Sequence, residues 1–139
     1  MMRTGVAFLI SMFLSATIAN TALTESNWTG EYANKKFLNG EAVLQFSIEQ
    51  SANAIKIAFD AAYNDAHGAA PDGEGQATIT GKNTLEFKWE DSFKNSGTGT
   101  IMRTGGGIIV SMKTMRVVDS RCLAFYGQKM RLRRVEKGT

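Results

Sequence analysis

Residues 44–60, with the sequence LQFSIEQSANAIKIAFD, decide the fold. Apolar side chains occupy every second position on both sides of a polar break, first in Leu44–Ile48 and again in Ile55–Phe59. A period of two residues places these side chains on one face of a β-strand, while the polar side chains between them face water. Two such runs joined by a short turn predict a pair of antiparallel strands that covers a core on one side.

The same alternation recurs further along the chain, in Leu85–Trp89, Ile108–Met112 and Met130–Leu132. Glycine-containing breaks separate the runs, and the single proline, Pro71, falls in an irregular segment where it removes no donor from a sheet. We predict eight or nine strands, at about 27–36, 40–50, 53–62, 74–81, 83–91, 97–104, 107–116, 121–127 and 128–136.

Short strands joined by tight turns are typical of an all-β meander. A meander of this length either leaves two exposed edges or closes on itself, and closure removes the edges. We therefore expect a single antiparallel up-and-down sheet that closes into a small barrel. Eight strands enclose a space that is filled either by side chains or by one small ligand.

The first residues of the chain have the layout of a secretory signal peptide. One basic residue, Arg3, precedes the apolar run Gly5–Ala16, and small residues follow up to Ala22. The run is shorter than the ~20 residues that a membrane-spanning helix needs. We predict that residues 1–22 are removed and that residues 23–139 form one exported domain, periplasmic or secreted, without a stable membrane span.

Charge is unevenly distributed along the exported part. Residues 23–91 hold five basic and eleven acidic residues, whereas residues 92–139 hold ten basic and two acidic ones. One interpretation is a two-faced surface whose basic side binds an anionic envelope partner such as a lipid headgroup, because export argues against a nucleic acid. The other interpretation is that neighbouring strands pair opposite charges across the sheet.

Residues 27–32, NWTGEY, place a tryptophan near a glycine at the start of the first strand, and residues 130–134, MRLRR, end the last strand with an arginine. An early Trp, an up-and-down meander and a terminal Arg resemble the calycin group, which includes lipocalins, avidins and fatty-acid-binding proteins. The resemblance implies that Arg134 lies across Trp28 and closes one end of the barrel through a cation–π contact.

If the barrel is hollow, its inward side chains line a pocket for a small apolar, amphipathic or anionic ligand. We expect a binding module of this kind, or one that binds another envelope component, with no catalysis and no cofactor. The predicted lining residues are Phe46, Ile57, Phe59, Phe87, Trp89 and Val110. If the barrel is filled instead, the same side chains form its core.

Residues 95–100, NSGTGT, resemble the Ser-Gly-rich loop of one family of small periplasmic lysozyme inhibitors, which are also exported eight-stranded barrels. The resemblance implies an alternative function: a periplasmic inhibitor or immunity protein that binds an envelope-acting enzyme, such as a lysozyme, through Ser96 and Thr98. The basic half of the chain around this segment opposes that encounter, because lysozymes are usually basic too.

The residue types that metal binding requires are sparse. His67, the only histidine, lies near Asp65, Asp72 and Glu74, but this spacing matches no established metal motif. Polar side chains in a glycine-rich loop are normally solvated, so we expect no metal site.

Candidates for catalysis are equally few. The only cysteine, Cys122, forms no internal disulfide and is expected to be a small buried hydrophobe in the middle of a strand, where it is a poor nucleophile for His67 to activate. Glycoside hydrolysis needs a pair of carboxylates, and Glu86, Glu90 and Asp91 are the candidates for such a pair. Ordinary surface charge explains these three residues. We therefore expect that the protein is not an enzyme.

Overall fold

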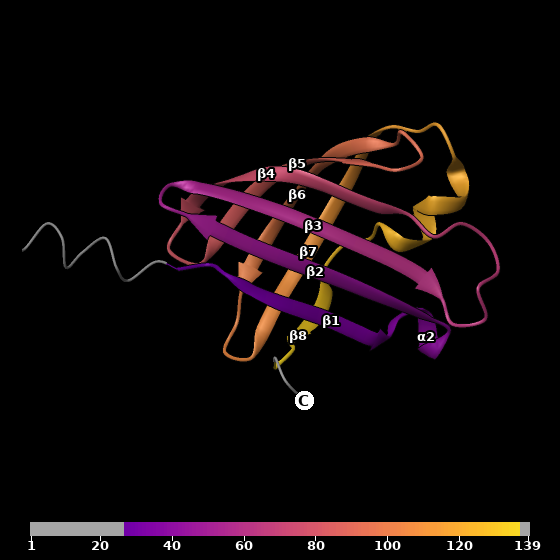
Figure 1. Cartoon of the computed structure of the whole chain (residues 1–139), viewed down its shortest axis with the longest axis horizontal. Helices are drawn as coiled ribbons and strands as arrows, with labels where there is room; N and C mark the ends of the chain where they lie inside the picture. The colour runs from indigo at the N-terminus through magenta and orange to yellow at the C-terminus, as the bar shows by residue number, and fades with distance from the viewer. Residues whose placement is uncertain (1–26, 137–139) are drawn as a thin grey trace, which may run out of the picture.

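Eight antiparallel strands follow one another around a closed barrel in the computed structural model, which describes residues 27–136. Neighbours along the chain are neighbours in the barrel, and the first strand pairs with the last through Tyr32↔Arg134 and Ala33↔Arg133 (Figure 1). The strands are β1 (Gly30–Lys36), β2 (Ala42–Ser51), β3 (Ala54–Tyr63), β4 (Asp72–Gly81), β5 (Thr84–Asp91), β6 (Ser96–Arg103), β7 (Gly107–Arg116) and β8 (Met130–Arg134). The predicted up-and-down barrel is confirmed; the predicted signal peptide lies outside the described residues.

Two short helical elements interrupt the meander. A single turn, α2 (Phe37–Gly40), connects β1 to β2, and a 3-10 helix, η1 (Ser120–Phe125), lies between β7 and β8. Within residues 27–136, no helix is long and apolar enough to cross a membrane.

The strand predicted at residues 121–127 is wrong, because this segment forms η1 and an extended connection instead. The buried side chains of η1, Cys122 and Phe125, are three residues apart, which is the spacing of a helical turn and not of a strand. The side chain of Asp119 caps the element by accepting a hydrogen bond from the Arg121 amide, at 3.0 Å.

Alternation along the strands separates the core from the outer wall as predicted. In β2, the side chains of Leu44, Phe46 and Ile48 are at most 2% exposed, whereas those between them face outward. Across the β2–β3 ladder, Phe46 lies opposite Phe59, so the two hydrophobic faces coincide. A register slip of one residue would move every one of these side chains to the solvent side.

Glycines on β6 give the large aromatic side chains of β5 their room. Trp89 is paired with Gly97, and Phe87 is paired with Gly99. A Cβ atom on Gly97 would lie 2.0 Å from the carbonyl oxygen of Lys113 and 2.9 Å from Cζ2 of Trp89. The indole ring therefore occupies the space that a side chain at position 97 would need.

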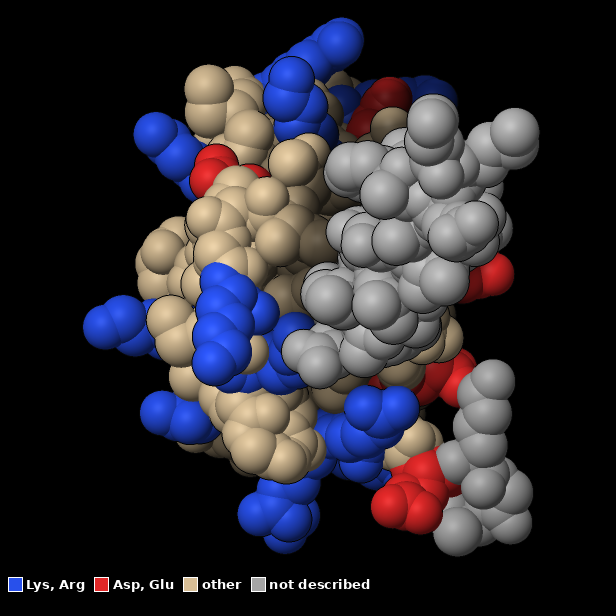
Figure 2. All heavy atoms as spheres, turned by 90° about the vertical axis from the view of Figure 1, so that its left-hand side faces the viewer, with Lys and Arg blue, Asp and Glu red and all other residues tan. Residues whose placement is uncertain are grey.

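Acidic and basic side chains gather on different parts of the barrel. The exposed carboxylates of Glu31, Asp60 and Glu74 lie on the wall formed by β1, β3 and β4, whereas Lys113 and Arg131 lie on β7 and β8. In an end-on view, most of the Asp and Glu spheres are on the right and most of the Lys and Arg spheres are on the left and centre (Figure 2). The charge asymmetry of the sequence thus becomes an asymmetry of the surface.

We predict that Gly97→Ala destabilises the fold by about 3 kcal/mol, at the upper end of the usual cost of overpacking, because its Cβ collides with backbone. Gly105→Ala is the matched control, since nothing lies within 4 Å of a Cβ atom there, and its effect should stay within about 0.5 kcal/mol. Urea unfolding of both variants measures the difference. Equal stabilities would contradict the packing of Trp89 on the glycine backbone.

Candidate functional site

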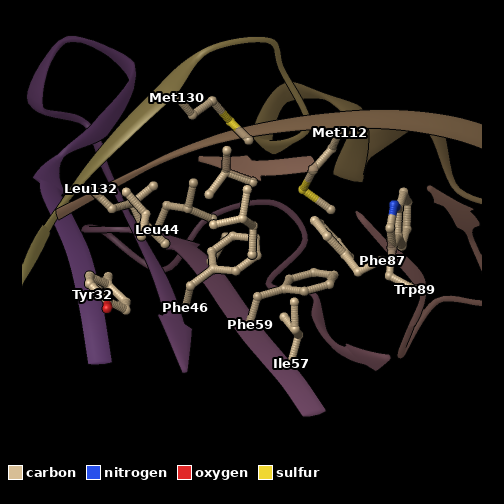
Figure 3. Packing of buried hydrophobic residues seen from close by; sticks show 14 of the residues in the cluster. Tyr32, Leu44, Phe46, Ile57, Phe59, Phe87, Trp89, Met112, Met130 and Leu132 are labelled. Carbon is tan, nitrogen blue, oxygen red and sulfur yellow. The ribbon is translucent and has the colours of Figure 1, made fainter. Parts of the chain in front are cut away.

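The six side chains predicted to line a ligand pocket form the core of the barrel. Each is between 0 and 3% exposed and belongs to the buried cluster, and Figure 3 shows five of them, all except Val110, in the interior. The Phe46 and Phe59 rings stack at 5.4 Å between centroids, and the Phe87 and Trp89 rings meet these two edge-on at 6.2 and 5.9 Å. These aromatic contacts occupy the interior with side chains. The outer wall and the two barrel ends are the surfaces that remain open to a partner.

One end of the barrel is closed by a hydrogen-bonded cluster around Asp91, a side chain that is only 4% exposed. Its Oδ1 accepts hydrogen bonds from the amides of Phe93 and Asn95, at 2.8 and 2.9 Å. Its Oδ2 accepts from Nδ2 of Asn95 at 2.9 Å and from the hydroxyl of Tyr126 at 2.6 Å. Burial and this bond to Asp91 raise the pKa of Tyr126, so its hydroxyl stays protonated.

The role of Asp91 was missed in the sequence, although its signal was there. Asp91 falls in phase with the inward residues of Leu85–Trp89, so it points inward, and the assignment to surface charge is wrong. Glu86 and Glu90 are exposed, as predicted. A buried carboxylate with four donors is a structural tie, because each hydrogen bond to the charged group offsets part of the cost of burying it.

The other end of the barrel corrects the predicted closing pair. Trp28 is buried, but Arg103 of β6, and not Arg134, lies over its ring, with Cζ 4.0 Å from the ring centroid. Arg103 also donates hydrogen bonds to the carbonyl oxygens of Asn27 and Lys82, at 3.1 and 3.4 Å. Arg134 is exposed and lies over a different ring, that of Tyr32 on β1, at 5.9 Å.

His67 and Cys122 are placed in different surroundings. His67 is in an exposed loop, where its ring stacks on Tyr63 at 4.2 Å and its Nδ1 contacts Oδ1 of Asp65. This hydrogen bond is the main cause that lowers the pKa of Asp65. Cys122 is fully buried on η1, not on a strand, and burial together with the nearby charges of Asp91 and Asp119 raises its pKa to about 11. Its thiol is therefore protonated at neutral pH and has no access to solvent.

The remaining candidates for metal binding do not converge. Asp72 and Glu74 lie on β4, whereas Asp65 and His67 are in the loop between β3 and β4. Among the described residues, no group of three or more His, Cys, Asp or Glu side chains is arranged to hold a metal ion.

The predicted recognition residues Ser96 and Thr98 are on strand β6, not in a protruding loop. Their side chains belong to the outer wall, where Ser96 is paired with Glu90 and Thr98 with Lys88. Ser96 thus lies between an acidic partner and a basic one, Arg116 on β7, whereas both partners of Thr98 are lysines, the second being Lys113.

An open groove of about 710 Å³ crosses the outer wall from β1 to β5 and is the strongest candidate site. Its floor is made of small side chains, among them Ala33, Ser47 and Ala58, which leave the wall hollow between larger neighbours. Besides one lysine, the charged residues at its sides are acidic: Glu31, Asp60, Asp72, Glu74, Glu90 and the buried Asp91.

The strand register brings like charges together in this groove. Asp60 lies directly opposite Asp72, and Glu74 lies directly opposite Glu90. Partial burial and the charge of Asp72 raise the pKa of Asp60. One basic side chain, Lys56, reaches Glu74 at 3.6 Å, but both partners are more than 60% exposed, so the pair contributes little. Like charges directly opposite each other on a sheet are destabilising, and the groove keeps two such pairs.

Comparisons with protein-family models, with curated proteins and with solved structures found no match to this chain. The closed eight-stranded barrel is compatible with a calycin-like architecture.

We predict that Arg103→Met lowers the free energy of unfolding by about 1–2 kcal/mol, because it removes the cation–π contact with Trp28 and two hydrogen bonds to backbone. Arg134→Met should cost less, about 0.5 kcal/mol, since its guanidinium is exposed and farther from a ring. Denaturant unfolding compares the two variants. A larger loss of stability for Arg134→Met than for Arg103→Met would indicate that Arg134, and not Arg103, is the partner of Trp28.

We predict that Asp60→Asn stabilises the protein at neutral pH by roughly 0.2–1 kcal/mol, because it removes the repulsion from Asp72. The pKa of Asp60 is raised on folding, so ionisation of its carboxyl group opposes folding. The wild-type protein therefore loses stability as the pH rises through that pKa. The advantage of the variant should therefore shrink as the pH falls below the usual carboxyl range. Thermal unfolding over a pH series tests this, and a variant less stable at neutral pH would refute it.

Proposed function

We propose that this protein is an exported, non-catalytic binding barrel whose acidic groove docks a basic protein of the cell envelope. The single observation that carries the proposal is the strand register, which sets Asp60 opposite Asp72 and Glu74 opposite Glu90 on an open wall. The repulsion between these like charges destabilises the unbound protein. A cationic partner relieves the repulsion when it binds, and that relief adds to its affinity.

The filled interior supports a site on the outside. An apolar ligand would have to displace the stacked rings of Phe46 and Phe59 and the side chains around them, which are already desolvated. The hollow wall, by contrast, is open to a large partner without any rearrangement of the core.

An envelope-acting enzyme with a basic surface, such as a muramidase, is the partner class that fits the groove. This proposal retains the functional part of the resemblance to periplasmic lysozyme inhibitors but moves the contact from Ser96 and Thr98 to the acidic wall. The basic residues of this chain would repel a basic enzyme, but they lie mainly on a different part of the surface from the groove. A partner that approaches the groove meets carboxylates first. The proposal also keeps the calycin-like relationship and an envelope location.

We expect that the triple variant Asp60→Asn, Glu74→Gln and Glu90→Gln weakens binding to a basic muramidase by roughly tenfold to a hundredfold, if each exposed charge contributes about 0.5–1 kcal/mol. The loss should be largest at low ionic strength, where screening is least. Isothermal titration calorimetry with a set of basic muramidases, using protein recovered after export of the full chain, measures it.

The matched control is Lys88→Gln with Lys113→Gln, which neutralises exposed cations on the neighbouring wall. Its affinity should equal or exceed that of the wild type. Wild-type protein that binds none of these enzymes, or that binds them equally well without its groove carboxylates, would overturn the proposal.

A further inference from the structure

The end of β7 and the connection that follows it toward η1 expose three apolar side chains within four residues, at the end of the barrel that lies on the right in Figure 1. Met115 is 66% exposed, Val117 is 51% exposed and Val118 is 55% exposed. Single exposed apolar residues are common on protein surfaces, but several together mark a contact surface. We call Met115–Val118 the apolar tip.

Two features of the fold hold the apolar tip outward. Between β6 and β7, Gly97 pairs with Thr114 and Ser96 pairs with Arg116, so Met115 is the extra residue of a β-bulge. Bulges redirect side chains and often stand beside functional surfaces.

The second feature is the buried side chain of Asn95. Its Oδ1 accepts hydrogen bonds from the amides of Val118 and Asp119, at 2.7 and 2.9 Å, while its own amide groups are held by Asp91. The tip is thus tied to the polar cluster that closes the barrel, and its aliphatic side chains stay in solvent because the backbone behind them is fixed.

Three basic side chains lie near the apolar tip in the chain. Lys94 precedes Asn95 in the β5–β6 turn, Arg116 is within the tip, and Arg121 follows it; all three are exposed. Arg121 lies over the Phe93 ring at 5.8 Å and is paired with Asp119. Positive charge around a small aliphatic surface complements an anionic bilayer, where apolar side chains enter the acyl boundary and cations stay at the phosphate level.

We propose that this end of the barrel docks on an anionic lipid surface, with Met115, Val117 and Val118 inserted and Lys94, Arg116 and Arg121 at the headgroups. The acidic wall begins at Glu90 beside Ser96, at this same end, so the anionic surface repels it and the barrel docks with that wall turned away from the lipid. This interaction uses a different surface from the acidic groove and does not depend on the proposed enzyme partner.

The experiment is co-sedimentation of the exported protein with vesicles of phosphatidylglycerol in phosphatidylcholine and with vesicles of phosphatidylcholine alone. We expect binding only to the anionic vesicles, with a loss of about fivefold in affinity for each of Lys94→Gln and Arg116→Gln. Met115→Ser with Val117→Ser should weaken binding at least tenfold. Both sets replace exposed side chains, so circular dichroism should report an unchanged fold.

Matched controls replace equivalent side chains elsewhere. Met102→Ser removes a methionine that is 50% exposed on the outer wall, and Lys82→Gln removes an exposed cation in the β4–β5 turn; neither should change vesicle binding. Insertion is measured separately with Val117→Trp, whose emission should shift to the blue when anionic vesicles are added, since Trp28 and Trp89 are already buried.

The proposal is overturned by equal binding to both vesicle types or by no binding to either. It is also overturned if the serine variants bind as tightly as the wild type, which would indicate adsorption by charge without insertion, or if the tip instead mediates a dimer that the serine variants dissolve. The serine variants should retain wild-type affinity for a basic muramidase, so failure here is distinguishable from failure of the acidic groove.

Discussion

Filling a narrow barrel with aromatic rings is the constraint on which the rest of this structure depends. Eight strands enclose room for packed side chains or for one small ligand, and here the rings of Phe46, Phe59 and Phe87 meet one another in that room. Trp89 fits beside them only because its partner on β6 is Gly97. A chain that uses its interior in this way has its outer wall and its ends available for recognition, because side chains there vary without cost to the core.

The buried carboxylate of Asp91 connects this core to the surface. Burial of a charge is costly unless hydrogen bonds replace the lost water, and four donors converge on Asp91. Tyr126, one of these donors, contacts the rings of Phe59 and Trp89, while Asn95, another, holds the backbone of the apolar tip. Core packing, end closure and tip geometry are therefore coupled through one polar group.

Sequence reasoning succeeded where the signal is local and failed where it depends on distant segments. Alternation predicted the strands because each inward side chain is decided by its own phase. The assignment of residues 121–127 failed because two buried residues in six are compatible with a strand or with a turn, and the capping hydrogen bond from Asp119 favours the turn. No local pattern distinguishes Arg103 from Arg134 as the partner of Trp28, since that choice depends on how the strands curve around the barrel.

The uneven charge of the chain had two interpretations, and the register of the acidic half contains pairings of both kinds. Cross-strand neutralisation accounts for Glu49 opposite Lys56, but the same ladders also place Asp60 against Asp72. A sheet selected only for stability would separate such pairs, because each costs free energy and an amide would remove that cost. The open wall retains this repulsion, and cations lie near exposed apolar side chains at the barrel end beside it. The barrel thus has an acidic surface and a second surface that is basic and apolar. A barrel that docked through its apolar tip at an anionic membrane, with its acidic wall turned away, would leave that wall free to meet a cationic protein.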